Sequence, residues 1–241
     1  MARVAVVTGG TRGIGQAISV ALKKKGFRVA ANYGGNDTAA RQFQADTGIP
    51  VYKWDVSDYA ACEKGVASVT RELGAIDVLV NNAGITRDGM LHRMTKESWD
   101  AVMHTNLDSV FNMSRLVIEG MRNRKYGRIV NISSINGRKG QMGQANYSAA
   151  KAALLGFTKA VAQENAARGV TVNVIAPGYI GTEMVAAMPK DVLDTKVLPL
   201  IPVGRLGTVE EIARCVTFLA DEEAGFITGA CLDANGGQYM A

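Results

Sequence analysis

Short apolar runs alternate along the chain with segments in which apolar residues recur every three or four positions. Such runs are typical of strands buried on both faces of a parallel sheet, and the longer segments predict amphipathic helices. The predicted strands are Val4–Thr8, Arg28–Asn32, Val51–Asp55, Val78–Asn81, Arg128–Ser133, Thr171–Ala176 and Cys231–Asp233. Because crossovers between parallel strands are right-handed, the alternation predicts an α/β fold, a doubly wound seven-stranded Rossmann sheet with helices on both faces.

Signals for helix ends support this organisation. Apolar residues at helical spacing from Ile14 to Leu22 are followed by Gly26 as a stop, and Thr208 and Glu211 form a capping box that opens another helix. Without repeats or internal boundaries, residues 1–241 are predicted to form a single domain. The irregular stretch 179–207 is either a substrate lid or a plain helical cover over the sheet, and we favour the lid.

Composition excludes several classes of function. The 241 residues are 47% apolar and 20% charged, as in an ordinary globular protein, and a net charge of +5 suits a phosphate-bearing small molecule. The basic residues are scattered, which argues against nucleic-acid binding. Three cysteines and two histidines form no disulfide or metal pattern. No signal peptide or apolar run of membrane-spanning length is present, so we expect a cytoplasmic protein.

A glycine-rich turn follows the first predicted strand, with the sequence Thr8-Gly9-Gly10-Thr11-Arg12-Gly13-Ile14-Gly15. Gly9, Gly13 and Gly15 allow the backbone to turn tightly and to approach a pyrophosphate, which the N-terminus of the next helix attracts. The spacing is a variant of the dinucleotide-binding fingerprint. Its place between a strand and an amphipathic helix predicts a cofactor site.

The end of the second strand distinguishes the two nicotinamide cofactors. NAD-binding folds place an acid here, but this strand ends without one, at Tyr33 and at Asn32, which we expect to contact the cofactor. Arg12 can pair with a 2′-phosphate. We therefore expect NADP(H). Asp37 lies slightly further along, where it either argues against NADP(H) as the missing acid or is an ordinary turn residue.

Two further strand ends face the same edge of the predicted sheet. Asp55 and Val56 end the third strand, where Asp55 either hydrogen-bonds an adenine or caps the next turn. Asn82, Ala83 and Gly84 end the fourth strand, where small residues leave room for a ribose although the asparagine can simply brace the turn.

Three residues suggest catalysis. Ser134 closes the fifth strand, and Tyr147 and Lys151 follow as Y-x-x-x-K, which places phenol and ammonium on one helix face. A nearby ammonium lowers a tyrosine pKa from its usual value of about 10, by roughly 1–3 units. Ser134 can stabilise a developing oxyanion. Asn106, in an otherwise apolar helix, either relays protons through water or is a satisfied core amide.

Together these motifs resemble the classical short-chain dehydrogenase/reductase family over the whole chain. The resemblance implies a Ser134–Tyr147–Lys151 mechanism with Asn106 as the fourth member, Lys151 also holding the nicotinamide ribose, and homotetramers as the usual assembly. It also implies further cofactor contacts, at Ile14, Ile85, Pro177, Gly178, Ile180 and Thr182.

Within the family, the sequence resembles NADPH-dependent reductases of acetoacetyl-coenzyme A in polyhydroxybutyrate synthesis, and the stretches that carry this resemblance are 82–88, 134–137, 139–144, 177–180 and 235–237. That similarity implies an acyl-CoA substrate and acyl contacts at Asp88, Gln141, Met142, Gln144, Gly178 and Tyr179, with Met142 where an aromatic residue often stands. Three alternatives remain: a reductase of carrier-protein-bound 3-oxoacyl groups, a reductase of small ketones or sugars, and an NADP-binding regulator without catalysis.

Overall fold

A seven-stranded parallel sheet forms the centre of the computed structural model, which describes residues 2–186 and 189–240. The strand order is β3-β2-β1-β4-β5-β6-β7. All seven predicted strands are present, and their ends differ from the predictions by two residues at most. The strands are β1 (Val4–Val7), β2 (Arg28–Tyr33), β3 (Val51–Lys53), β4 (Ile76–Asn81), β5 (Gly127–Ile132), β6 (Val170–Pro177) and β7 (Cys231–Ala234).

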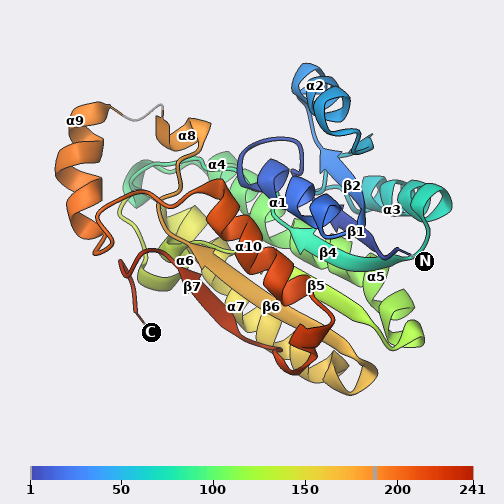
Figure 1. Ribbon diagram of the computed structural model, residues 1–241. Coiled ribbons are helices and arrows are strands. Elements are labelled where there is room, and N and C mark those ends of the chain that lie inside the picture. The colour runs from blue at the N-terminus through green and yellow to red at the C-terminus, as the bar shows by residue number, and fades with distance from the viewer. Residues whose placement is uncertain (1, 187–188, 241) are drawn as a thin grey trace.

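Helices cover both faces of the sheet, as predicted. Figure 1 shows one helical layer in front of the sheet and the other behind it. The front layer consists of α1 (Gly13–Lys24), α2 (Asp37–Thr47) and α10 (Val209–Ala220), and the rear layer of α3 (Tyr59–Leu73), α5 (Ser109–Arg124) and α7 (Ala145–Asn165). The capping box of Thr208 and Glu211 opens α10 as expected.

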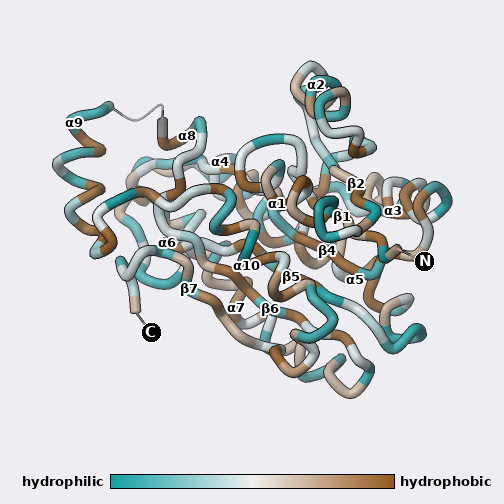
Figure 2. The backbone as a smooth tube through the Cα atoms, viewed as in Figure 1, coloured by the Kyte–Doolittle hydropathy of each residue, from teal (hydrophilic) through white to brown (hydrophobic). Residues whose placement is uncertain are grey.

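The apolar side chains of alternate strand positions separate into two cores. In β1, Ala5 and Val7 face α1 and α10, whereas Val4 and Val6 face α3 and α5. Figure 2 shows apolar residues along the central strands and polar residues mainly on the outer turns. Burial on both faces explains why the strands read as continuous apolar runs.

Shorter helices gather at the carboxyl edge of the sheet. They are α4 (Lys96–Met103), a π-helical turn at His104–Asp108, α6 (Ile135–Lys139), α8 (Glu183–Ala186) and α9 (Lys190–Val192). The expected lid, 179–207, is partly helical, and residues 187–188 of it lie outside the described part. Its two ends meet, because Gly207 N donates to Tyr179 O at 3.0 Å and Gly181 N donates to Gly207 O at 2.9 Å.

In the part of the chain that the structure describes, no helix is both long and apolar enough to span a membrane.

Candidate active site

The glycine-rich turn lies where the strand order reverses, between β1 and its neighbours β2 and β4. Gly9 and Gly13 have positive φ values of 60° and 53°, which side chains disfavour. At Gly15 a Cβ atom would lie 2.1 Å from Gly9 O, so α1 begins directly against the turn. This cradle fits a pyrophosphate bound at the N-terminus of α1.

The turn also requires glycine at position 10, which the sequence did not indicate. A Cβ atom there would lie 2.8 Å from Val7 O and 3.1 Å from Ala31 Cα. The turn therefore packs against β2 as closely as against α1. Arg12, the residue before α1, has an extended backbone and an exposed side chain.

Thr8, also missed, connects β1 to the end of β4. Its Oγ1 accepts hydrogen bonds from the backbone N–H groups of Asn82 at 2.9 Å and Ala83 at 3.0 Å. In return, Asn82 Nδ2 donates to Thr8 O at 2.9 Å and to Gly9 O at 3.2 Å. The Asn82 side chain thus braces the turn, one of the two roles considered for it.

The side chain of Asn32 forms hydrogen bonds that link the glycine turn to the end of β3. It is 1% exposed; its Oδ1 accepts from Gly9 N at 3.3 Å and its Nδ2 donates to Trp54 O at 3.0 Å. Asp55 is exposed, and its Oδ1 accepts from both the N–H and the hydroxyl of Ser57, at 2.9 and 2.7 Å. Val56 is buried beside it. The turn after β3 is therefore tied to the glycine turn.

Lys151 lies inside the protein. The residue is 4% exposed, and its Nζ donates to Ile132 O at 2.8 Å and lies 5.8 Å from the centre of the Tyr147 ring. Gly84 makes room for it, since a Cβ atom there would lie 3.5 Å from Lys151 Nζ and 3.2 Å from Asn106 Oδ1. Burial lowers the pKa of Lys151 to about 8.

Ser134 is the N-cap of α6, and its Oγ accepts from Asn136 N at 3.1 Å. Burial raises the pKa of Tyr147, and the nearby Ser134 hydroxyl offsets part of that rise. The expected lowering by Lys151 is not found, because desolvation outweighs an ammonium that points to Ile132 O.

Asn106 occupies the centre of the π-helical turn between α4 and α5 and is fully buried. Its Oδ1 accepts from Ile85 N at 2.8 Å and its Nδ2 donates to Ile85 O at 2.9 Å. The amide is satisfied by the chain after β4, and π-helical turns are frequent at functional sites. The sequence analysis expected a helix here but not its widened turn.

A third missed residue, Asn146, secures the start of α7. It is fully buried, its Nδ2 donates to Arg87 O at 2.9 Å and to Ser98 O at 3.2 Å, and its Oδ1 accepts from Tyr147 N at 2.8 Å. Nearby, Gln144 Nε2 donates to Asp88 Oδ2 at 2.8 Å. Two of the expected acyl contacts are therefore paired beside Tyr147.

The segment after β6 faces the glycine turn. Gly178 N donates to Ala234 O at 3.0 Å, and a Cβ atom on Gly178 would lie 2.8 Å from Asn235 Cα. Thr182 approaches Gly13, where a Cβ atom would lie 3.9 Å from Thr182 Cγ2. Pro177 and Ile180 are buried, so this segment forms the wall of the site opposite α1.

The remaining expected acyl contacts lie at the rim. Gln141 is exposed and Met142 is 81% exposed. Tyr179 is half-buried and lines a cavity of about 260 Å³ together with Ile180 and Ile201. Among the described residues, no group of His, Cys, Asp and Glu is placed to hold a metal ion. The site thus offers an acid, a cation and a hydroxyl beside a dinucleotide cradle.

Comparisons with known proteins show the family of the chain. A family model described as enoyl-(acyl carrier protein) reductase matches residues 9–238. The chain is 67% identical to the acetoacetyl-CoA reductase of Shinella zoogloeoides over 240 residues and 66% identical to that of Rhizobium meliloti (strain 1021) over 241, with 100% of each chain covered in both comparisons. It is 46% identical to the 3-oxoacyl-[acyl-carrier-protein] reductase of Vibrio cholerae over 240 residues, covering 99% of this chain and 98% of that protein. The chain belongs to the short-chain dehydrogenase/reductase family and is an oxidoreductase acting on CH–OH groups.

Proposed function

We propose that the protein reduces acetoacetyl-CoA to (R)-3-hydroxybutyryl-CoA with NADPH. The observation that carries the proposal is the position of Lys151 Nζ 5.8 Å from the centre of the Tyr147 ring, with Gly84 directly beside Lys151. Relatives named acetoacetyl-CoA reductase at 67% and 66% identity support the choice of substrate.

The residues divide the work of carbonyl reduction. NADPH, when bound, supplies the hydride for the 3-carbonyl carbon. Tyr147, whose usual pKa of about 10 burial raises further and which is therefore protonated at neutral pH, gives the phenolic proton to the carbonyl oxygen. The Ser134 hydroxyl donates a hydrogen bond to that oxygen as it gains charge. Lys151, cationic below about pH 8, holds the nicotinamide ribose.

The choice of NADPH rests on charge at the end of β2. Asp37 carries the nearest carboxylate, and its oxygens lie 3.0 Å from Lys53 Nζ. Lys53 and a hydrogen bond from Tyr33 hold the pKa of Asp37 below its usual range. A paired carboxylate repels a 2′-phosphate less than an isolated one, and Arg12 supplies a positive charge from the glycine turn. Asp37 is the first residue of α2 and is paired with Lys53, so we do not assign it as a ribose ligand.

The acyl thioester is assigned to the rim beside Tyr147. Gln141 and Gln144 are neutral donors suited to a thioester carbonyl, with Asp88 orienting Gln144 through their hydrogen bond. Met142, Gly178 and Tyr179 complete the acyl contacts. We assign the segment 179–207 as the lid, because its ends are fastened together at the site.

The main alternative is reduction of carrier-protein-bound 3-oxoacyl groups. The similarity to the 3-oxoacyl-[acyl-carrier-protein] reductase of Vibrio cholerae supports it. Rates are compared for acetoacetyl-CoA, an acetoacetyl carrier protein and a small ketoester, each with NADPH and NADH. We expect the highest kcat/KM with acetoacetyl-CoA and NADPH. A much higher value on the carrier protein supports the alternative, a preference for the small ketone supports a small-ketone reductase, and no turnover of any substrate supports a regulator.

We further propose a cytoplasmic homotetramer. Three phenylalanines are unusually exposed for a single chain: Phe111 at 53%, Phe218 at 56% and Phe226 at 102%. They lie on α5, on α10 and in the turn before β7, so more than one face offers apolar contacts. Light scattering of the purified chain gives the mass, and a monomer would contradict the proposal.

A further inference from the structure

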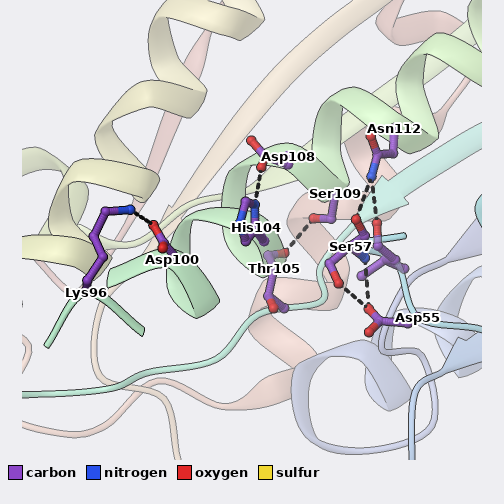
Figure 3. Close-up of polar contacts among 10 residues, drawn as sticks. Asp55, Ser57, Lys96, Asp100, His104, Thr105, Asp108, Ser109 and Asn112 are labelled. Atoms are coloured by element: carbon purple, nitrogen blue, oxygen red, sulfur yellow. Dashed lines mark hydrogen bonds and ion pairs between the residues drawn. The ribbon is translucent and has the colours of Figure 1, made fainter. Parts of the chain in front are cut away.

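The side chain of Asn112, on α5, forms hydrogen bonds with the turn that follows β3. Asn112 is 6% exposed, and its Nδ2 donates to Val56 O at 3.0 Å and to Ser57 O at 3.3 Å. Figure 3 shows the Asn112 amide pointing from the helix toward this turn, with Asp55 on the far side of Ser57. The contact joins residues 55 and 56 positions apart in the sequence.

Beside Asn112, α5 carries the apolar residues Met113, Val117 and Met121, which are buried in the core between the sheet and the rear layer. An amide buried next to them is costly unless its hydrogen bonds are made. Asn112 makes them to two consecutive carbonyl groups, so it fixes the direction of the backbone at Val56 and Ser57.

That backbone in turn orients Asp55. One carboxylate oxygen of Asp55 accepts from the N–H and the hydroxyl of Ser57. The other, Oδ2, has no hydrogen bond within the described residues. The turn has a second support, since Asn32 Nδ2 donates to Trp54 O. Asn32 therefore fixes the start of the turn, and Asn112 fixes its end.

We propose that Asn112 is a positioning residue for the adenosine end of the cofactor. The inference rests on the proposed function, in which Asp55 and Val56 contact the adenine. Asn112 acts through the backbone that carries those two residues and does not touch the cofactor itself. The same run of helix holds Ile85 through Asn106, so α5 and its π-helical start position two cofactor-binding turns at once.

The test separates the two ends of the cofactor. For Asn112→Ala we expect the Kd of NADPH and the Kd of adenosine 2′,5′-bisphosphate to rise together by about tenfold, as expected for losing hydrogen bonds that hold a binding turn. The kcat at saturating NADPH should stay within about twofold of the wild type, because the groups around Tyr147 are unchanged. Asn112→Ser, which leaves a smaller cavity, should give an intermediate effect and replaces the alanine variant if that one does not fold.

Asn165→Ala is the matched control. Asn165 is also a buried asparagine of the rear layer, where its Nδ2 donates to Val161 O and its Oδ1 accepts from Arg122, but it lies at the end of α7 near the opposite edge of the sheet. Its variant should lose stability with no change in either Kd. Wild-type binding by both Asn112 variants, or an equal rise in Kd for Asn165→Ala, would overturn the inference. A wild-type protein that binds no NADPH would instead overturn the proposed function.

Discussion

At the scale of single residues, burial determines which protons are available for chemistry. Tyr147 and Lys151 lose water on folding, and desolvation opposes the charged form of each. The phenol therefore stays protonated at neutral pH, and the ammonium keeps its charge only below about pH 8. A neutral acid beside a cation suits reduction, in which a proton is delivered to the carbonyl oxygen.

Removing the phenolic hydroxyl tests the assignment of the acid. Tyr147→Phe keeps the ring and its packing but leaves no proton to donate. We expect kcat to fall by about 10³-fold, within the range for losing a general acid, while the Kd of NADPH changes little. Stopped-flow measurement of NADPH consumption and a fluorescence titration check both values. Turnover close to that of the wild type would contradict the role of Tyr147.

A second substitution tests the cost of burying Lys151. Its pKa of about 8 in the folded protein lies below the ordinary lysine value of 10.5, so the unfolded chain binds more protons between these pH values. The cost to stability is full below about pH 8 and disappears above pH 10.5. At neutral pH it amounts to about 3 kcal/mol, against about 1 kcal/mol for the hydrogen bond to Ile132 O.

Lys151→Met should therefore stabilise the fold by about 2 kcal/mol at pH 7 while abolishing turnover. At pH 10 the gain should nearly vanish, because the folded-state lysine is then neutral and only the unfolded-state lysine still binds a proton, so most of the cost is gone. Urea unfolding of the two proteins at pH 7 and pH 10 measures the difference. A variant that is less stable than the wild type by the same amount at both pH values would show that the ammonium carries no such cost.

Residues whose side chains form hydrogen bonds with distant main-chain groups were not predicted from the sequence. Ser134, Tyr147 and Lys151 were found because their spacing follows from local geometry, a strand end and one helix face. Thr8 and Asn146 bond to backbone groups 48 to 75 positions away. No local pattern marks such contacts, since a buried threonine or asparagine resembles a turn residue until its partners are in place.

At the scale of elements, the turn between β1 and α1 illustrates how little space the cofactor site allows. Gly15→Ala places a methyl group 2.1 Å from Gly9 O and 2.6 Å from Asn82 Nδ2, a clash with backbone that cannot be relieved by a rotamer change. We expect NADPH affinity to fall by about 100-fold or more, because α1 must move away from the turn.

The control for this prediction is Gly120→Ala in α5. There the added methyl group meets no backbone and only the guanidinium of Arg124, at 3.1 Å from Nη1, so stability should rise by about 0.5–1 kcal/mol and binding should not change. Isothermal titration with NADPH and thermal unfolding of both variants provide the comparison. Normal affinity in Gly15→Ala would show that the turn does not hold the cofactor.

Element types were predictable from the sequence, but details of their geometry were not. Apolar runs and helical spacing identified the strands and the capping box of α10. The widened turn at Asn106 was not foreseen, because a π-helical turn differs from an α-helix by one residue and depends on the bonds of Asn106 to Ile85. Local periodicity carries no information about those partners.

At the scale of the whole molecule, the doubly wound topology brings the site together. The strand order reverses beside β1, so the glycine turn, the ends of β3 and β4, and α6 meet at one edge of the sheet. The alternation of strands and helices predicted this class of fold through the right-handed crossover. How the start of α5 supports the turn after β3 depends on packing across the rear layer, which only the structure shows.

Long-range charge gives the last prediction. The protein carries a formal charge of +5, and both NADPH and a coenzyme A thioester bring several negative phosphates. Attraction of this kind speeds association and is screened once the Debye length falls from about 10 Å at 0.1 M salt toward about 3 Å at 1 M. With NADPH held saturating, kcat/KM for acetoacetyl-CoA should drop several-fold over that range, while kcat/KM for ethyl acetoacetate, which has no phosphate, should change little. Initial rates at four salt concentrations give both curves, and parallel curves for the two substrates would show that the phosphates of coenzyme A are not recognised by charge.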